Sequence, residues 1–337
     1  MMRSSLAGVA STAATLFPYP FQAISSSQQK SATLPVITVG SLYGNKVDIV
    51  MSNDDGWAEM NIRAFYDALN YYNRHISPAN SSVVLSAPAL NMSGTGSLNG
   101  TAELVKDGCQ FGSCPASSPG IGFNSSDPHL NYVNAFPVTA MSYGITTLSP
   151  KIFGGPPDFA VSGPNVGSNF DIQVPFSGTV GAAVAAINLG IPAISFSGKS
   201  GSQISYTDEP VPFYAKAYAE LAVWITFTLT RHPIKPYLPE GVWLNVNFPT
   251  VDWDTKTCVN YKEFKFILSR IYPAIPFVDA PDVKTCGSDR LPTERSVLER
   301  SGCYVSISVG NKSKLDAGEA AQKVVLEKLS DLLSCLP

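Results

Sequence analysis

Charged residues are scarce in this sequence, and neither sign of charge is in strong excess. Asp, Glu, Lys and Arg make up 15% of the 337 residues, and the formal net charge is -3. A nucleic-acid-binding domain carries a basic patch, so binding to a nucleic-acid duplex is not expected. No apolar run reaches the ~18 residues of a membrane-spanning helix, so no membrane span is expected. Gly and Pro are abundant instead, with 26 residues each, which indicates many loops around a well-buried interior.

Histidine is also rare, and its scarcity excludes several kinds of catalytic site. The three histidines are His75, His129 and His232. The Gly-x-Ser-x-Gly motif of an α/β-hydrolase is absent, so none of them has the expected serine partner. A haloacid-dehalogenase-type phosphatase needs an Asp two residues after its nucleophilic Asp. Gly56 and Trp57 occupy those positions after Asp54 and Asp55. The sequence therefore does not fit this class of phosphatase.

The most informative stretch runs from Lys46 to Trp57, where strand-forming residues end in Asn53-Asp-Asp-Gly56. Apolar residues then recur at helical spacing, which predicts a helix over 62–75. Two carboxylates therefore lie at a strand-to-helix corner, the kind of corner that lines ligand sites in open α/β sheets. Asp-Gly alone is typical of a simple turn. Consecutive buried carboxylates, however, repel each other unless a cation neutralises them, which favours a functional corner.

Alternating strand and helix patterns continue beyond this corner. Further strands are predicted at 82–87, 158–163, 191–197, 242–248, 258–272 and 303–309, and helices at 139–148, 177–189, within 209–231 and at 315–333. Strand-helix-strand spacing favours parallel strands whose carboxyl ends share one edge. We therefore predict an α/β fold: a Rossmann-like three-layer α/β/α sandwich with a mostly parallel sheet, plus a smaller β-rich C-terminal extension.

The chain divides into five predicted segments. Residues 1–23 have the pattern of a signal peptide and 24–45 form an N-terminal extension; the alternative is the N-terminal tail of a cytosolic protein. The main α/β domain spans 46–250 and includes an inserted loop at 98–137, rich in Gly, Ser, Asn and Pro, that could cover the acidic corner. Residues 251–337 complete the same domain.

Cysteines and glycosylation sequons favour the secretory pathway, with an extracellular, cell-wall or vacuolar destination. Sequons begin at Asn80, Asn91, Asn99, Asn124 and Asn311. Six cysteines allow 15 disulfide connectivities, among which sequential pairing is the simplest. The candidate disulfides are therefore Cys109–Cys114, Cys258–Cys286 and Cys303–Cys335.

Polar side chains gather at the predicted strand ends and at the start of the helix at 177–189. They are Asn53, Asp54, Asp55, Asn91, Ser93, Asn165, Asn169, Ser177 and Thr179. Their hard oxygen donors select Mg²⁺, Mn²⁺ or Ca²⁺ over Zn²⁺ or copper. The helix start, with Gly178 in its first turn, is either an ordinary capped terminus or a phosphate site. A hard divalent ion beside such a helix implies a phosphate ester as ligand.

Four motifs in order resemble the SurE family of metal-dependent phosphatases and nucleotidases. They are Ser52-Asn-Asp-Asp-Gly56, Asn91-Met-Ser-Gly94, Pro157-Asp-Phe-Ala-Val-Ser-Gly-Pro-Asn165, and Ser177-Gly-Thr-Val-Gly181 with Gly190-Ile-Pro-Ala193. The similarity is close over 48–198 and continues loosely to 249. The cysteine-bearing insertion and the secretory features resemble the fungal acid-phosphatase branch. Bacterial relatives carry Ala-Pro-Gly after the acidic pair, whereas Ala58-Glu-Met-Asn61 stands here, which leaves nucleoside preference open.

The resemblance implies specific roles for the converging residues. Asp54 and Asp55, with Ser93 and Asn165, would hold Mg²⁺, Mn²⁺ or Ca²⁺, and the two carboxylates are the candidate catalytic groups. The implied phosphate contacts are Asn53, Asn91, Asn169, Ser177, Gly178 and Thr179. The implied reaction is that of an acid phosphatase or a 5'- or 3'-nucleotidase on a small phosphate ester or nucleotide, in a homodimer or homotetramer.

The alternative from another class is a secreted, metal-dependent binding module without turnover, because no general acid or nucleophile is evident. If the protein is an enzyme, Asp54→Ala and Asp55→Ala abolish turnover and leave the fold intact. Asn91 is both a phosphate candidate and a sequon acceptor. Since a glycan there would block the site, we expect Asn91 to be unmodified in active protein.

Overall fold

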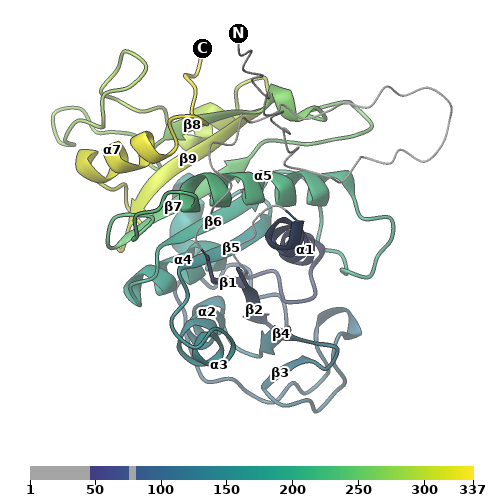
Figure 1. The fold of residues 1–337 in the computed structure, drawn as a ribbon. Coiled ribbons are helices and arrows are strands. Elements are labelled where there is room, and N and C mark those ends of the chain that lie inside the picture. Colours follow the sequence, from purple (N-terminus) through teal and green to yellow (C-terminus); the bar gives the residue numbers. More distant parts are fainter. Residues whose placement is uncertain (1–45, 76–80) are drawn as a thin grey trace, which may run out of the picture.

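A nine-stranded sheet runs through the computed structural model, which describes residues 46–75 and 81–337. Its strand order is β3-β4-β2-β1-β5-β6-β7-β9-β8 (Figure 1). The strands are β1 (Ile49–Ser52), β2 (Val83–Pro88), β3 (Ile121–Asn124), β4 (Asp127–Val133), β5 (Phe159–Val166), β6 (Ala193–Gly198), β7 (Val242–Phe248), β8 (Lys265–Ser269) and β9 (Tyr304–Asn311). The six strands from β4 to β7 are parallel, and the antiparallel pairs are β3 with β4 and β7 with β9.

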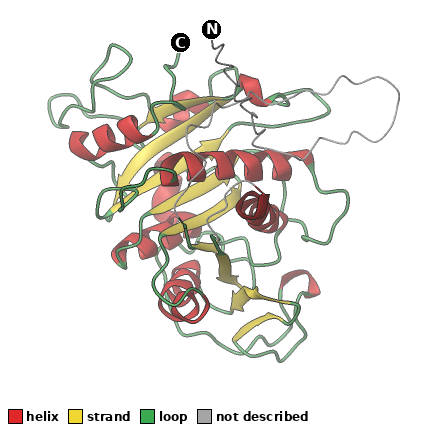
Figure 2. Cartoon of the chain, viewed as in Figure 1, coloured by secondary structure: helices red, strands yellow, loops and turns green. Residues whose placement is uncertain are grey.

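Helices cover both faces of the sheet (Figure 2). They are α1 (Met60–His75), α2 (Pro137–Tyr143), α3 (Ser149–Ile152), α4 (Gly178–Asn188), α5 (Phe213–Thr230), α6 (Glu294–Leu298) and α7 (Glu319–Lys328), with a π-helical turn at Gly144–Leu148 between α2 and α3. Helices α1 and α5 pack together on one face, and α2 and α4 on the other. The predicted three-layer α/β/α sandwich is therefore confirmed. In the described part of the chain, no helix is both long and apolar enough to cross a membrane.

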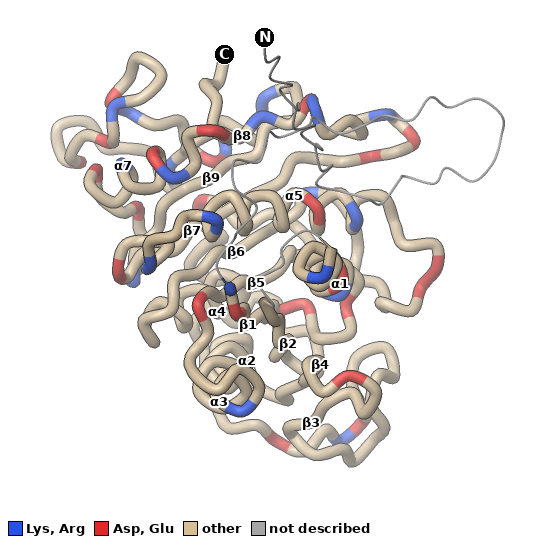
Figure 3. The backbone as a smooth tube through the Cα atoms, viewed as in Figure 1, with Lys and Arg blue, Asp and Glu red and all other residues tan. Residues whose placement is uncertain are grey.

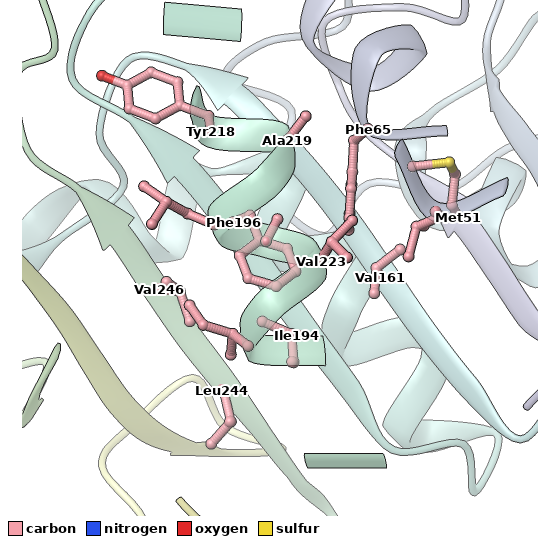
Figure 4. Packing of buried hydrophobic residues seen from close by; sticks show 14 of the residues in the cluster. Met51, Phe65, Val161, Ile194, Phe196, Tyr218, Ala219, Val223, Leu244 and Val246 are labelled. Atoms are coloured by element: carbon pink, nitrogen blue, oxygen red, sulfur yellow. The ribbon is translucent and has the colours of Figure 1, made fainter. Parts of the chain in front are cut away.

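Period-two alternation divides the interior of the sheet into two cores. Ile49 and Met51 of β1 face the core under α1 and α5, whereas Val50 faces the core under α2 and α4. In the larger core, shown in Figure 4, the ring of Phe65 from α1 meets the ring of Phe196 from β6 edge-on at 5.5 Å. Because both faces are covered, these strands read as continuous apolar runs. The acidic corner therefore follows a fully buried strand.

Two sequence predictions about loops and strand lengths need correction. The segment 98–137 was predicted to be an inserted loop, but β3 and β4 lie within it and β4 pairs with β2. The strand predicted over 258–272 is confined to Lys265–Ser269, preceded by a 3₁₀ turn at Tyr261–Glu263. Since β8 and β9 follow β7 in the same sheet, the C-terminal residues extend the sheet that carries the site.

One predicted disulfide is confirmed and two are wrong. Cys109 pairs with Cys114, but Cys258 pairs with Cys303 and Cys286 with Cys335. The cause is strand pairing: Cys258 and Cys303 precede the parallel neighbours β8 and β9, and Cys303 itself accepts a backbone hydrogen bond from Lys265. The residues of the predicted signal peptide and N-terminal extension, and the sequon at Asn80, lie outside the described residues.

Candidate active site

The corner after β1 is closed by Asn53 and Gly56. The Asn53 side chain donates to the Gly56 carbonyl over 3.1 Å and accepts from its N–H over 3.2 Å. Gly56 has φ of 111°, and a Cβ there would lie 2.0 Å from Oε1 of Gln110. This left-handed, crowded position requires glycine. Both polar atoms of the Asn53 amide therefore shape the corner, and its predicted contact with phosphate stays a prediction.

Asp54 points to the first turn of α4. Its carboxylate accepts a short hydrogen bond from the hydroxyl of Thr179, and a Cβ at Gly178 would lie 2.8 Å from the Cβ of Asp54. Ser177 caps the helix by accepting from the N–H of Val180 over 3.1 Å. The structure thus brings together the predicted metal ligand Asp54 and three predicted phosphate contacts at one helix start.

Asp55 points to the neighbouring loops instead. Its Oδ2 accepts from the backbone N–H of Val166 at the end of β5 over 2.8 Å, and its Oδ1 accepts from Nε2 of Gln203 over 2.7 Å. The Asp54 and Asp55 side chains are 2% and 1% exposed. Asp54 thus reaches the first turn of α4, whereas Asp55 reaches the end of β5 and the loop between β6 and α5.

Ser93 and Asn91 join this arrangement from the loop after β2. Oδ1 of Asn91 accepts from both the N–H and the hydroxyl of Ser93, over 2.9 and 2.7 Å. Nδ2 of Asn91 donates to Oε1 of Gln203 over 2.8 Å. The backbone also connects the two loops, because the N–H of Met92 donates to the carbonyl of Asp54 over 2.7 Å. The predicted ligand Ser93 therefore lies beside the acidic pair.

Asn165 and Asn169 flank the site on β5 and the loop that follows. Asn165 lies within β5, one residue before Val166, and its Nδ2 donates to the carbonyl of Gly167 over 2.6 Å. The donors of Asn165 are thus directed to the backbone. Asn169 donates through Nδ2 to Oγ of Ser197 over 2.9 Å. The ligand role predicted for Asn165 and the phosphate role predicted for Asn169 stay predictions.

Burial governs the electrostatics of the acidic pair. It raises the pKa of both the Asp54 and the Asp55 carboxyl above the usual range, and the Asp54 charge raises the pKa of Asp55 further. Hydrogen bonds oppose the shift: that of Thr179 lowers the pKa of Asp54, and those of Val166 and Gln203 lower the pKa of Asp55. None of the ion pairs formed by the described residues includes either carboxylate. Within residues 46–75 and 81–337, these two adjacent buried carboxylates therefore lack a cationic partner.

The donor chemistry fits a hard divalent ion. Each carboxylate can accept about four hydrogen bonds or ligand contacts, so the hydrogen bonds described above leave lone pairs free on both. Oxygen ligands of this kind suit Mg²⁺, Mn²⁺ or Ca²⁺, and the charge of the ion would compensate the buried pair. Among the described residues, no group of three or more His, Cys, Asp or Glu side chains could hold a metal. Neutral oxygens, such as those of Ser93 and Asn165, would have to complete the ligand set.

Sequence reasoning missed several residues that support the site. Gln203 gave no signal as a lone glutamine in a polar loop. Asn245 and Asn247 of β7 hold the backbone of Asn169: Asn245 donates to its carbonyl over 2.8 Å, and Asn247 accepts from its N–H over 2.8 Å. Their alternate spacing on a strand could have indicated that both point to one face.

Glu59 is a third buried carboxyl near the pair. Its Oε2 accepts from the N–H groups of Asn61 and Ile62 over 2.6 and 3.4 Å, so it caps the first turn of α1. Burial, followed by the charge of Asp55, raises its pKa well above the usual range. The sequence showed Glu59 only as a departure from the bacterial Ala-Pro-Gly pattern.

Comparison with known proteins places this geometry in a family. Residues 49–267 match the sequence profile of the family described as survival protein SurE. The chain belongs to the SurE family. An acid phosphatase of Yarrowia lipolytica is 34% identical to it over 297 residues, which cover 79% of each chain. The 5'-nucleotidase SurE of Lawsonia intracellularis is 29% identical over 210 residues, which cover 61% of this chain and 67% of that protein.

A solved SurE protein shares the fold. The crystal structure of the SurE protein from Aquifex aeolicus aligns with a TM-score of 0.51 at 22% identity, covering 79% of this chain and 93% of that chain. The resemblance read from the four motifs is therefore confirmed, and the acid phosphatase of Yarrowia agrees with the fungal branch of the SurE family.

Proposed function

We propose that this protein is a divalent-metal-dependent phosphomonoesterase, an acid phosphatase or nucleotidase that hydrolyses nucleoside monophosphates or related small phosphate esters. The observation that carries the proposal is the pair of buried carboxylates, Asp54 and Asp55, beside the first turn of α4. Membership of the SurE family and similarity to proteins named acid phosphatase and 5'-nucleotidase support hydrolysis of phosphoric monoesters.

Each part of the proposed reaction can be given to particular residues of the chain. Asp54 and Asp55, with Ser93 and Asn165, would hold Mg²⁺, Mn²⁺ or Ca²⁺. When bound, the ion would polarise the phosphoryl group and activate the attacking water. The first turn of α4 offers backbone N–H groups and the positive end of the helix dipole to the phosphate. Because Gly178 has no side chain, Asp54 can pack against that turn.

The distribution of charge favours a small substrate over a nucleic-acid duplex. Lys and Arg are interspersed with Asp and Glu along the chain rather than gathered on one element (Figure 3). This distribution supports the expectation that no nucleic-acid duplex binds.

We further propose a secretory-pathway location, supported by the engagement of all six cysteines in disulfides. We also propose a homodimer or homotetramer, as the family resemblance implies.

The test is phosphate release from nucleotides, p-nitrophenyl phosphate and polyphosphate. Wild-type protein is expected to release phosphate, to lose that activity in EDTA and to regain it with Mg²⁺, Mn²⁺ or Ca²⁺. Asp54→Asn and Asp55→Asn are expected to lower the rate at least ~100-fold, since each removes a charged oxygen from the ion's surroundings. Asp289→Asn, an exposed aspartate far along the chain, is the matched control. Folded protein that releases no phosphate with any ion would instead support the binding module.

A further inference from the structure

Gln203 lies at the point where three loops of the site meet. It belongs to the loop between β6 and α5, and its side chain is half-buried. Its Nε2 donates to Oδ1 of Asp55 over 2.7 Å. Its Oε1 accepts from Nδ2 of Asn91 over 2.8 Å and, more weakly, from Nε2 of Gln110 over 3.4 Å. Both ends of one amide are thus engaged by residues from different parts of the chain.

We propose that Gln203 is a positioning residue for the metal site, which fixes Asp55 and, through Asn91, the loop that carries Ser93. This inference rests on the proposed function, because it concerns residues that would hold the divalent ion. Gln203 itself would not touch the ion or the substrate. Its role would be to hold the candidate ligands at one geometry before the ion binds.

The contacts of Asp55 show why an amide suits this position. The Val166 N–H engages Oδ2 and Gln203 engages Oδ1, so the plane of the carboxylate is fixed from two sides. Gln203 is neutral, so it orients the carboxylate without neutralising it. A Lys or Arg in its place would form an ion pair with Asp55 and compete with a cation for the same oxygens. The charge of Asp55 is therefore left for an ion.

The other end of the amide reaches the loop after β2. Asn91 uses Nδ2 to bind Gln203 and Oδ1 to accept both donors of Ser93. A continuous chain of hydrogen bonds thus joins Ser93 to Asp55 through Asn91 and Gln203. Since Asn91 and Ser93 are both exposed, little apolar packing holds their side chains in place. The amide of Gln203 supplies the anchor that packing does not.

The disulfide loop Cys109–Cys114 packs beside these residues and supports them. Gln110 follows Cys109, and its N–H donates to the carbonyl of Ala89 over 3.0 Å, next to the loop of Asn91. The hydroxyl of Ser113 accepts from the indole N–H of Trp57 over 2.9 Å. The disulfide therefore holds Gln110 between the acidic corner and Gln203.

The test measures the affinity of the metal-free protein for Mn²⁺ by isothermal titration calorimetry, with activity as a second readout. Gln203→Met keeps the length of the side chain and removes both hydrogen-bonding groups. We expect it to weaken Mn²⁺ binding 10- to 100-fold, the usual effect of losing a residue that orients a metal ligand. Ser202→Ala, on the same loop, is expected to bind Mn²⁺ as the wild type does. Circular dichroism of the metal-free proteins checks that each variant is folded.

A second variant approaches the same chain of bonds from the exposed side. Asn91→Ala is expected to weaken Mn²⁺ binding. The double variant Asn91→Ala/Gln203→Met is expected to have about the same Mn²⁺ affinity as the weaker-binding single variant, because both substitutions break the same chain of hydrogen bonds. If Gln203→Met does not fold, the Mn²⁺ affinity of Asn91→Ala is the test of the inference. If the folded variants bind Mn²⁺ with the same affinity as the wild type, this inference is overturned and the proposed function still stands. Folded wild-type protein that neither binds Mn²⁺ nor releases phosphate would overturn both.

Discussion

At the scale of single residues, the site depends on two neighbours with different surroundings. Asp54 is bonded to a hydroxyl at the start of α4, and Asp55 to a backbone N–H and a side-chain amide. The sequence predicted the location of the pair, because an apolar strand that ends in two carboxylates is unusual. It did not predict Gln203, because a lone glutamine in a loop has no pattern that distinguishes it from a solvated residue.

Thr179 offers a test at this scale. Thr179→Val keeps the shape of the side chain but removes the donor to Asp54, so a buried carboxylate loses a partner. We expect the free energy of unfolding to fall by about 1 to 3 kcal/mol, and phosphate release to fall with it. Urea denaturation and initial rates measure the two effects. Thr179→Ser retains the hydroxyl and should retain most of both; a valine variant that matches wild type would show that the contact is unimportant.

At the scale of helices and strands, periodicity predicted the elements that pack on both sides. Helix α1 was predicted from Ile62 onward and begins at Met60, and β7 has the predicted bounds. The hairpin of β3 and β4 was missed because β4 starts with Asp-Pro-His, residues that are rare in strands, and is buried only from Leu130 onward. Its pairing with β2, and not its own composition, makes it a strand.

Helix α5 carries a buried acid that links its packing to pH. Glu220 is buried and hydrogen-bonded to Tyr261, and burial raises its pKa to about 7. Between the ordinary glutamate pKa and that value, the folded state holds a proton that the unfolded state has lost. The stability from this group is therefore full at low pH and is lost as the pH rises through about 7.

Glu220→Gln should remove this pH dependence, because a neutral amide does not titrate. The variant is expected to gain stability relative to wild type between pH 5 and pH 7.5, by at most about 3 kcal/mol for a shift of this size. Urea denaturation at the two pH values measures the difference. The exposed Glu240→Gln serves as control. A variant whose stability follows wild type at both values would show that Glu220 is ionised in the folded protein throughout.

At the scale of the whole molecule, one sheet joins the site to the C-terminal residues. Strand β7 holds the backbone of Asn169 through two asparagines, and β8 and β9 continue the sheet beyond β7. The family and the layer architecture were predictable from motif order and from the alternation of strands and helices. The disulfide pairing was not, because it depends on which strands become neighbours, and this is a property of the folded sheet.

The two larger disulfides should contribute more to stability than the small one. Cys109 and Cys114 are separated by 5 positions, and Cys258 and Cys303 by 45. From loop-closure entropy, the double variant Cys109→Ser/Cys114→Ser should lose about 2 kcal/mol and Cys258→Ser/Cys303→Ser about 4 kcal/mol. Urea denaturation of the two double variants gives the comparison. Equal losses, or the reverse order, would contradict the entropic account for this protein.

The crossed connectivity of the C-terminal cysteines also bears on how the oxidised protein is made. Along the chain, Cys258 is nearer to Cys286 than to its native partner Cys303, and Cys303 is nearer to Cys335 than to Cys258. Cys286 and Cys303 are nearer still to each other. Shorter loops close at lower entropic cost, so oxidation of the unfolded chain favours such non-native pairs. Those pairs must be broken by thiolate attack before the native ones form. The yield of native protein therefore depends on disulfide exchange as well as on an oxidant.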